Sequence, residues 1–135
     1  MDNNTIYIII GLVGFIVFIF TVVEINNLTR KKRRISAKTR MLIEEKIQKL
    51  KNGDKNRGMI ELDIILTNLL KMNGLKGTTG EMLKNSSGLI KDYNSLWHAH
   101  KIRNKIAHEM DYKISEHDFK KNMNVYLRAF KDLGL

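Results

Sequence analysis

The longest apolar stretch of the chain lies near its N-terminus. Residues 6–23 carry no charged side chain, and their few polar groups do not form the face that a soluble helix shows. A helix of these 18 residues would extend over about 27 Å, close to the hydrocarbon thickness of a bilayer. The pattern predicts a transmembrane helix over residues 6–23, preceded by a tail of residues 1–5.

A cleaved signal peptide is the alternative to a retained anchor. A signal peptide begins with a basic region, whereas Asp2 is the only charged side chain before this stretch. The exit of the stretch reads TVVEINN and offers no cleavage site between small residues. These two features favour an anchor that stays in the protein.

Beyond residue 40 the apolar positions recur every three or four residues, which predicts helices, and no hairpin signal interrupts them. The predicted fold class is therefore all-α: a transmembrane helix followed by a small bundle of four or five helices. Polar caps and glycine stops delimit the segments. The predicted helices cover residues 38–51, residues 55–72 after the cap Asp54, a short helix from the capping box of Thr78 and Glu81 to residue 85, a helix from Asp92 or Asn94 to residue 109, and a helix from the cap Ser115 to the C-terminus.

Composition and charge narrow the function classes. The chain of 135 residues has no cysteine, which excludes disulfides, thiolate zinc sites and a thiol nucleophile. Its 24 basic and 14 acidic residues give a net charge of +10. Residues 30–40 hold seven of the basic residues and no acidic one. Most of the excess charge therefore follows directly after the apolar stretch.

The basic segment predicts the topology of the protein. By the positive-inside rule, the side of the membrane that holds residues 30–40 is the cytoplasm. We therefore expect a short tail outside, a juxtamembrane segment over residues 24–40 and a cytoplasmic helical domain over residues 41–135. Three roles for these bases stay open: the topology signal alone, binding of anionic lipid headgroups, or contact with RNA phosphates. The candidate membrane-surface residues are Arg30, Lys31, Lys32, Arg33 and Arg34.

The helix before residue 109 carries the most informative polar residues. At about 100° per residue, Arg103, Asn104 and His108 project from a face that Leu96 also occupies. Polar groups on a half-buried face must be paired or used, because leaving them unpaired in a dry interior costs several kcal/mol. The sequence leaves two interpretations open, a functional site or a structural network in which Arg103 pairs with Glu109 or another acid.

The motif Arg103–Asn104–Lys105–Ile106–Ala107–His108 resembles the R-x(4–6)-H signature of the HEPN superfamily, in which a polar residue commonly follows the arginine. The resemblance covers roughly residues 55–133. The wider string WHAHKIRNKIAHE also resembles a group of small, single-span bacterial proteins with no assigned function. HEPN domains are bundles of four or five helices, and many are metal-independent endoribonucleases that act as two-fold dimers over one RNA cleft.

The resemblance implies roles for named residues. His108 would be the general acid and base, Arg103 the phosphate clamp and Asn104 an orienting donor, with His100, Lys101 and Lys105 as RNA- or partner-binding residues. It implies a homodimer and no cofactor. On one unbroken helix, however, the directions of the Arg103 and His108 side chains differ by about 140°. The two side chains of a single copy therefore do not meet at one point. A zinc site from His98, His100 and His108 is disfavoured, because residues two apart on a helix point in different directions.

Two function classes follow. The first is a binding or assembly module, displayed at the cytoplasmic face and docking a cytoplasmic protein or RNA. The second is a membrane-tethered, metal-independent endoribonuclease of stress or phage defence. The chemistry of the second is consistent with the motif, because histidine titrates near neutrality and arginine offers a planar fork for phosphate.

Overall fold

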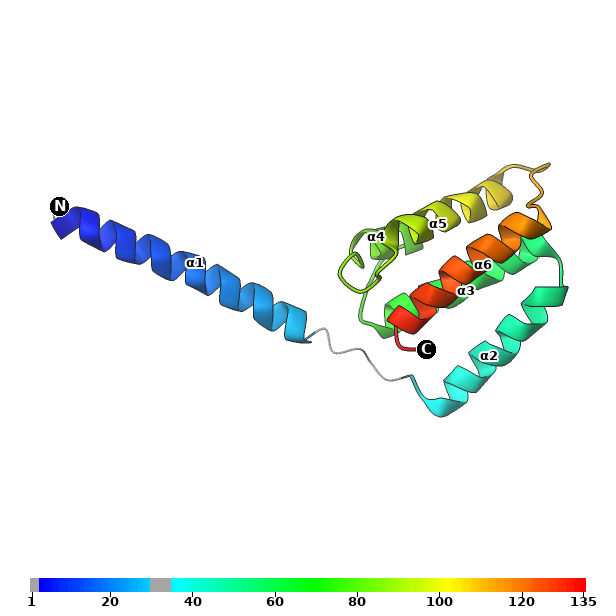
Figure 1. The fold of residues 1–135 in the computed structure, drawn as a ribbon, viewed down its shortest axis with the longest axis horizontal. Helices are drawn as coiled ribbons and strands as arrows, with labels where there is room; N and C mark the ends of the chain where they lie inside the picture. Colours follow the sequence, from blue (N-terminus) through cyan, green and yellow to red (C-terminus); the bar gives the residue numbers. More distant parts are fainter. Residues whose placement is uncertain (1–2, 30–34) are drawn as a thin grey trace. The chain divides into compact units, whose positions relative to one another are not determined.

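The computed structural model describes the backbone of residues 3–29 and 35–135 and the side chains of residues 6–23 and 35–135. Its contacts divide the chain into two compact units, residues 1–31 and residues 32–135 (Figure 1). Within the described residues there are six helices and no strand. The predicted all-α class is confirmed, and each unit is described in turn.

The first unit is the single helix α1 (Asn3–Thr29). Its segment Ile6–Val23 is long and apolar enough to cross a membrane, and none of it is buried against other residues. The one threonine of the segment, Thr21, bonds through Oγ1 to the carbonyl oxygens of Val17 at 3.1 Å and Phe18 at 2.8 Å. Its hydroxyl therefore needs no water partner, as a bilayer interior requires. A signal sequence near an N-terminus passes the same test of length and composition.

The second unit begins with two helices joined by a short turn. Helix α2 spans Ala37–Asn52, and α3 spans Lys55–Met72. Asp54 caps α3 by accepting a hydrogen bond from the backbone N–H of Arg57 at 2.7 Å, so this helix starts where the sequence predicts. The apolar residues that recur every three or four positions along α3 are buried as a continuous face: Met59, Leu62, Ile65, Leu66, Leu69 and Leu70.

The first helix of the bundle starts within one residue of the predicted helix over residues 38–51. Ser36 accepts a hydrogen bond from the backbone N–H of Thr39 at 3.2 Å, and this cap starts α2 at Ala37. Ile35 is already buried in the core. The first turn of α2 carries Lys38 and Arg40, so the end of the basic segment 30–40 is helical.

Three further helices complete the unit. Helix α4 spans Thr79–Lys84, α5 spans Tyr93–His108, and α6 spans Glu116–Asp132. The predicted capping box at the start of α4 is present, with Glu81 accepting from the backbone N–H of Thr78 at 2.8 Å. The glycine-rich turn before it needs residues that tolerate positive φ, since Gly74 has φ of 86° and Gly77 of 109°.

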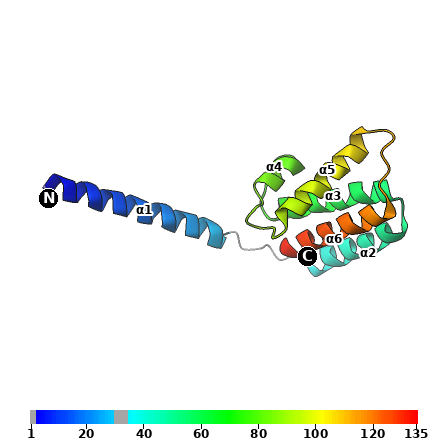
Figure 2. The same ribbon diagram turned by 45° about the horizontal axis from the view of Figure 1, so that its top comes forward.

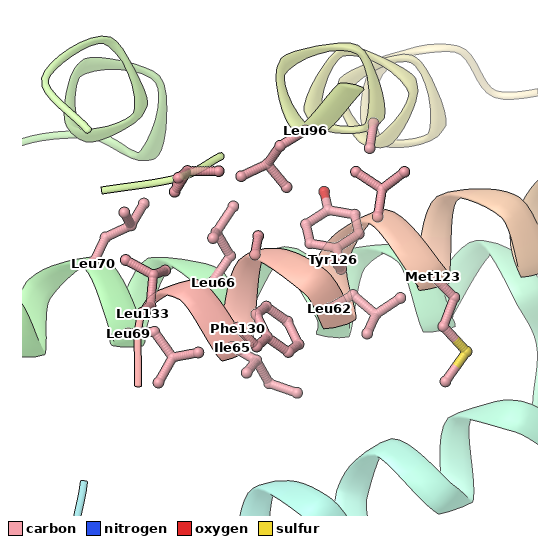
Figure 3. Packing of buried hydrophobic residues seen from close by; sticks show 14 of the residues in the cluster. Leu62, Ile65, Leu66, Leu69, Leu70, Leu96, Met123, Tyr126, Phe130 and Leu133 are labelled. Atoms are coloured by element: carbon pink, nitrogen blue, oxygen red, sulfur yellow. The ribbon is translucent and has the colours of Figure 1, made fainter. Parts of the chain in front are cut away.

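The helices surround one core. Helix α3 packs against α2, α4, α5 and α6, and α6 also packs against α5. Figure 1 and Figure 2 show α3 and α6 side by side in the middle, with α5 and α2 on opposite sides of this pair. In Figure 3, Leu62, Leu66 and Phe130 meet between α3 and α6, and Tyr126 directs its oxygen toward α5. The hydroxyl of Tyr126 thus lies at the side of the core that faces α5, the helix that carries the R-x4-H motif.

A polar side chain of α3 stabilises the connection between α5 and α6. Asn56 of α3 donates to the carbonyl of Tyr112 at 2.6 Å and accepts from the backbone N–H of Ile114 at 3.0 Å. Both partners lie in the loop between α5 and α6, so this one amide replaces hydrogen bonds that the loop backbone would otherwise lack. The loop holds the C-terminal end of α5 and hence the end of the motif.

Candidate functional site

A buried carboxylate organises the polar residues around the motif. Asp63 lies in the middle of α3 with only 2% of its surface exposed. Its Oδ1 lies 2.8 Å from Nδ1 of His100 on α5 and accepts a hydrogen bond of 3.0 Å from the Tyr126 hydroxyl on α6. Its Oδ2 forms an ion pair with Nε of Arg103 at 3.3 Å, although the N–H is not aligned as in a hydrogen bond. One carboxylate therefore ties three helices together.

The contacts of His100 define the role of each ring nitrogen. A carboxylate oxygen only accepts hydrogen bonds, so Nδ1 carries the hydrogen in this contact. Nε2 lies 3.3 Å from Nδ2 of Asn104, an amide donor, so Nε2 is the acceptor of the neutral ring. The imidazole is buried, and its ring lies 5.9 Å from that of Trp97. His100 is therefore held in one tautomer by two partners.

Asn104 closes the network into a ring. Its Oδ1 accepts from Nη1 of Arg103 at 3.1 Å, while its Nδ2 faces His100. The four side chains Asp63, His100, Asn104 and Arg103 thus contact one another in a closed circuit. The negative charge of Asp63 is balanced by Arg103, as a buried carboxylate requires. About a quarter of the Arg103 side chain (27%) remains exposed, so the guanidinium still meets solvent.

The electrostatics of the network act most strongly on Tyr126. Burial, followed by the charge of Asp63 and the hydrogen bond to it, raises the pKa of the Tyr126 hydroxyl well above its usual value of 10.0. Arg103 opposes this shift in the pKa. Tyr126 is therefore a permanent donor to Asp63 at physiological pH, while its ring packs in the apolar core.

His108 stands apart from this network. It is the last residue of α5, and its side chain is exposed. It lines a shallow hollow together with Lys101, Asn104, Lys105 and the acidic Glu109. The expected half-buried face is thus occupied by Arg103 and Asn104, whereas His108 lies on the solvent side. Asn104 belongs both to the buried ring and to the hollow.

The structure therefore separates the predicted site residues into two groups. Arg103, Asn104 and His100 form the buried ring, and Lys101, Lys105 and His108 surround the hollow. The acid that pairs with Arg103 is Asp63 rather than Glu109. The candidate membrane-surface residues, Arg30, Lys31, Lys32, Arg33 and Arg34, lie outside the described residues. Among the residues that are described, no group of three or more histidine or acidic side chains is placed to hold a metal ion.

Sequence reasoning missed Asp63. A signal was present, because Asp63 falls within the apolar stripe of its helix, four residues after Met59 and three before Leu66. A single acid in such a stripe predicts a buried charge that needs partners. The partners His100 and Tyr126 lie 37 and 63 residues further along the chain than Asp63. Their identity depends on how α5 and α6 pack against α3, which the periodicity of one helix does not reveal.

Comparisons with protein-family models, with curated proteins and with solved structures found no match to this chain.

Proposed function

We propose that this chain is a single-span membrane protein that displays its helical bundle at the cytoplasmic face, and that the bundle is a binding or assembly module for a phosphate-bearing partner. The apolar segment 6–23 supports the anchor, and the basic residues directly after it support the orientation. The solvent face of α5 supports the choice of partner, because Lys101, Lys105 and His108 meet there around one hollow.

One observation favours binding over catalysis. In a metal-independent ribonuclease, the arginine must be free to grip the phosphate, whereas here Arg103 already contacts Asp63 and Asn104. The contact with Asp63 joins α5 to α3, which is the task of a structural residue. The groups that remain for a ligand around the hollow are two ammonium groups, one imidazole, one amide and the carboxylate of Glu109. The two ammonium groups outnumber the single carboxylate, so the set still attracts phosphate through charge.

The resemblance to HEPN domains carries a second candidate function, a membrane-tethered endoribonuclease. The exposure of His108 beside Asn104 and Lys105 favours it, because an accessible imidazole can move protons at neutral pH. In this reaction His108 takes the 2′-OH proton, the 2′ oxygen attacks phosphorus, and a 2′,3′-cyclic phosphate forms. The 5′ oxygen leaves with a proton from His108 of a second copy, so this function requires a homodimer.

One experiment separates the two candidates. The full chain in uncharged detergent micelles is incubated in EDTA with a mixed RNA pool, and products and bound fraction are measured together. The variants are His108→Ala and, as a matched control, His117→Ala, which removes an imidazole that is 88% exposed on α6. A Lys101→Gln/Lys105→Gln double variant tests the cationic groups of the hollow.

Each outcome is decisive. Binding that is lost in the double variant, without cleavage by the native chain, supports the binding module. Cleavage that leaves a cyclic phosphate and disappears only in His108→Ala makes the protein a ribonuclease. RNA that neither binds nor is cleaved contradicts the ribonuclease and excludes RNA as the phosphate-bearing partner of the module. Light scattering of the same samples measures whether a dimer forms.

A further inference from the structure

A row of exposed polar residues extends the hollow along the whole of α5. Asn94, His98, Lys101, Lys105 and His108 are all exposed and recur at intervals of three or four residues, which places them on one side of the helix. The row is about 21 Å long at 1.5 Å per residue. Helix α5 itself contains no acidic residue. Of the two acids that flank it, Asp92 is paired with Arg128, and Glu109 lies beside His108 at the C-terminal end of the row.

A second hollow flanks the N-terminal half of the row. It has a volume of about 460 Å³ and lies between α5 and α6. His98 and Ser95 line it from α5, and Lys121, Asn124 and Arg128 line it from α6. Its floor includes the buried Val125 and Asn122. The lining thus combines cationic groups at the rim with amides and a hydroxyl that both donate and accept hydrogen bonds.

The two basic residues of this second hollow differ in how far their charge is already paired. Arg128 forms an ion pair with Asp92 at 2.9 Å, which balances part of its charge. Lys121 is exposed on the same side of α6, three residues before Asn124. Lys121 is therefore the main cationic group that α6 offers to a ligand in the hollow.

An aromatic pair borders the same row on its other side. The rings of Tyr93 and Trp97 stack at 6.2 Å with an interplanar angle of 18°, and both side chains are half-buried. The ammonium group of Lys101 lies 6.0 Å from the centre of the Trp97 ring. A cation beside a partly exposed aromatic ring is the combination that binds a phosphate and stacks the attached base.

We propose that the row on α5, the α5–α6 hollow and the Tyr93–Trp97 pair together form a binding path for single-stranded RNA. The inference rests on the proposed function and adds the class of nucleic acid. Lys101, Lys105 and Lys121 contact phosphates, and the amides of the hollow contact base edges. Base edges in a duplex are occupied by pairing, and the major groove of duplex RNA is too narrow for side chains, so the hollow selects unpaired bases.

The test uses the full chain in uncharged detergent micelles. Binding of a labelled single-stranded RNA of mixed sequence is compared with binding of the matching duplex by fluorescence polarisation over a series of salt concentrations. Lys121→Gln is the variant, and Lys131→Gln is its control, because Lys131 is an exposed lysine of the same helix that faces the hollow between α2 and α6 instead. Trp97 is the only tryptophan of the chain, so its fluorescence reports on base stacking.

We expect the single strand to bind more tightly than the duplex and to quench Trp97. Lys121→Gln should weaken binding several-fold and make the slope of log K against log salt less negative by about 0.7, the value for one lost phosphate contact on a single strand. Lys131→Gln should bind as the native chain does. Two results would overturn this path but leave the proposed function standing. One is equal affinity for the single strand and the duplex. The other is loss of binding in the Lys101→Gln/Lys105→Gln variant while Lys121→Gln and Lys131→Gln behave alike. Absence of any RNA binding overturns this path and the ribonuclease alike.

Discussion

Tyr126 donates its hydroxyl hydrogen to Asp63 across 3.0 Å, and this bond joins α6 to α3 within the core. The two residues are 63 positions apart, and each is almost fully buried. Because the same carboxylate also faces His100 and Arg103, its removal affects three helices at once. The first predictions concern this network.

Replacing Asp63 by alanine should lower the free energy of unfolding by about 3 kcal/mol. Loss of one partner of a buried pair typically costs about 3–5 kcal/mol, and partial exposure of Arg103 places the effect near the lower limit. Asp63→Asn keeps an acceptor for Tyr126 and should lose less. Urea denaturation followed by Trp97 fluorescence measures the change. Asp111→Ala, which removes an exposed acid from the α5–α6 loop, should lie within about 0.5 kcal/mol of the native chain.

The stability of the bundle should fall at alkaline pH through Tyr126. The pKa of this hydroxyl is raised in the folded state, so above the usual tyrosine pKa of about 10 the unfolded chain loses a proton that the folded chain retains. This contribution to stability is complete below pH 10 and declines as the pH rises further.

Tyr126→Phe removes this alkaline component, although it costs about 1–2 kcal/mol at neutral pH because Asp63 loses a donor. Urea midpoints measured from pH 8 to pH 11 give the comparison. Tyr112→Phe removes a hydroxyl outside the network and should keep the alkaline decline. A decline of equal size in Tyr126→Phe would show that Tyr126 is not its source.

The two histidines of α5 should respond differently to substitution. His100→Ala opens the ring around Asp63 and should destabilise the bundle by about 2–3 kcal/mol, since buried acceptors lose their donor. His108→Ala changes an exposed side chain and should stay within about 0.5 kcal/mol. Thermal melts of both variants distinguish a structural histidine from one available to a ligand. A similar melting temperature for the two variants would contradict this division.

Gly58 should tolerate no side chain. A Cβ at this position would lie 2.7 Å and 2.9 Å from two ring atoms of Phe119, a core residue that is 1% exposed. Overpacking of about 1–3 kcal/mol opposes the gain of about 1 kcal/mol in helix propensity, and two contacts this short should give Gly58→Ala a net loss of about 1–2 kcal/mol. Gly80→Ala is the control, because its Cβ would meet only Nε2 of His100 at 3.9 Å. That variant should be neutral or slightly stabilised.

The proposed topology is testable through the absence of cysteine from the chain. A single cysteine introduced before residue 6 should react with a membrane-impermeant maleimide added to intact cells, whereas Ser115→Cys, at the start of α6, should react only after lysis. Intact mass measured on the membrane fraction tests whether the apolar segment is retained. Labelling of Ser115→Cys in intact cells would reverse the orientation.

The sequence predicts helices well where a cap and a stripe coincide. The bounds of α3 follow from Asp54 and its buried apolar face, and the capping box predicts α4. The predicted start of α2 at residue 38 lies one residue from the observed Ala37, although the first turn of this helix is basic. At the site, the sequence indicates Arg103 and Asn104 as groups that need partners.

The identity of those partners was beyond the reach of the sequence. The partner Asp63 comes from a helix whose periodicity reports on apolar residues alone. The angular separation of His108 from Arg103 follows from helix geometry. Which of the two side chains is buried, however, depends on which face of α5 packs against α3 and α6. These are tertiary relationships between distant segments, and local patterns do not specify them.

The central position of α3 also has a consequence for the order in which the bundle opens. Since α3 packs against four other helices, its backbone amides become accessible to solvent only when all four have separated from it. Helix α2 packs chiefly on α3 and can detach while the rest stays closed. In hydrogen–deuterium exchange, the amides of α2 should therefore exchange through a partial opening of low free energy, and those around Asp63 only through global unfolding.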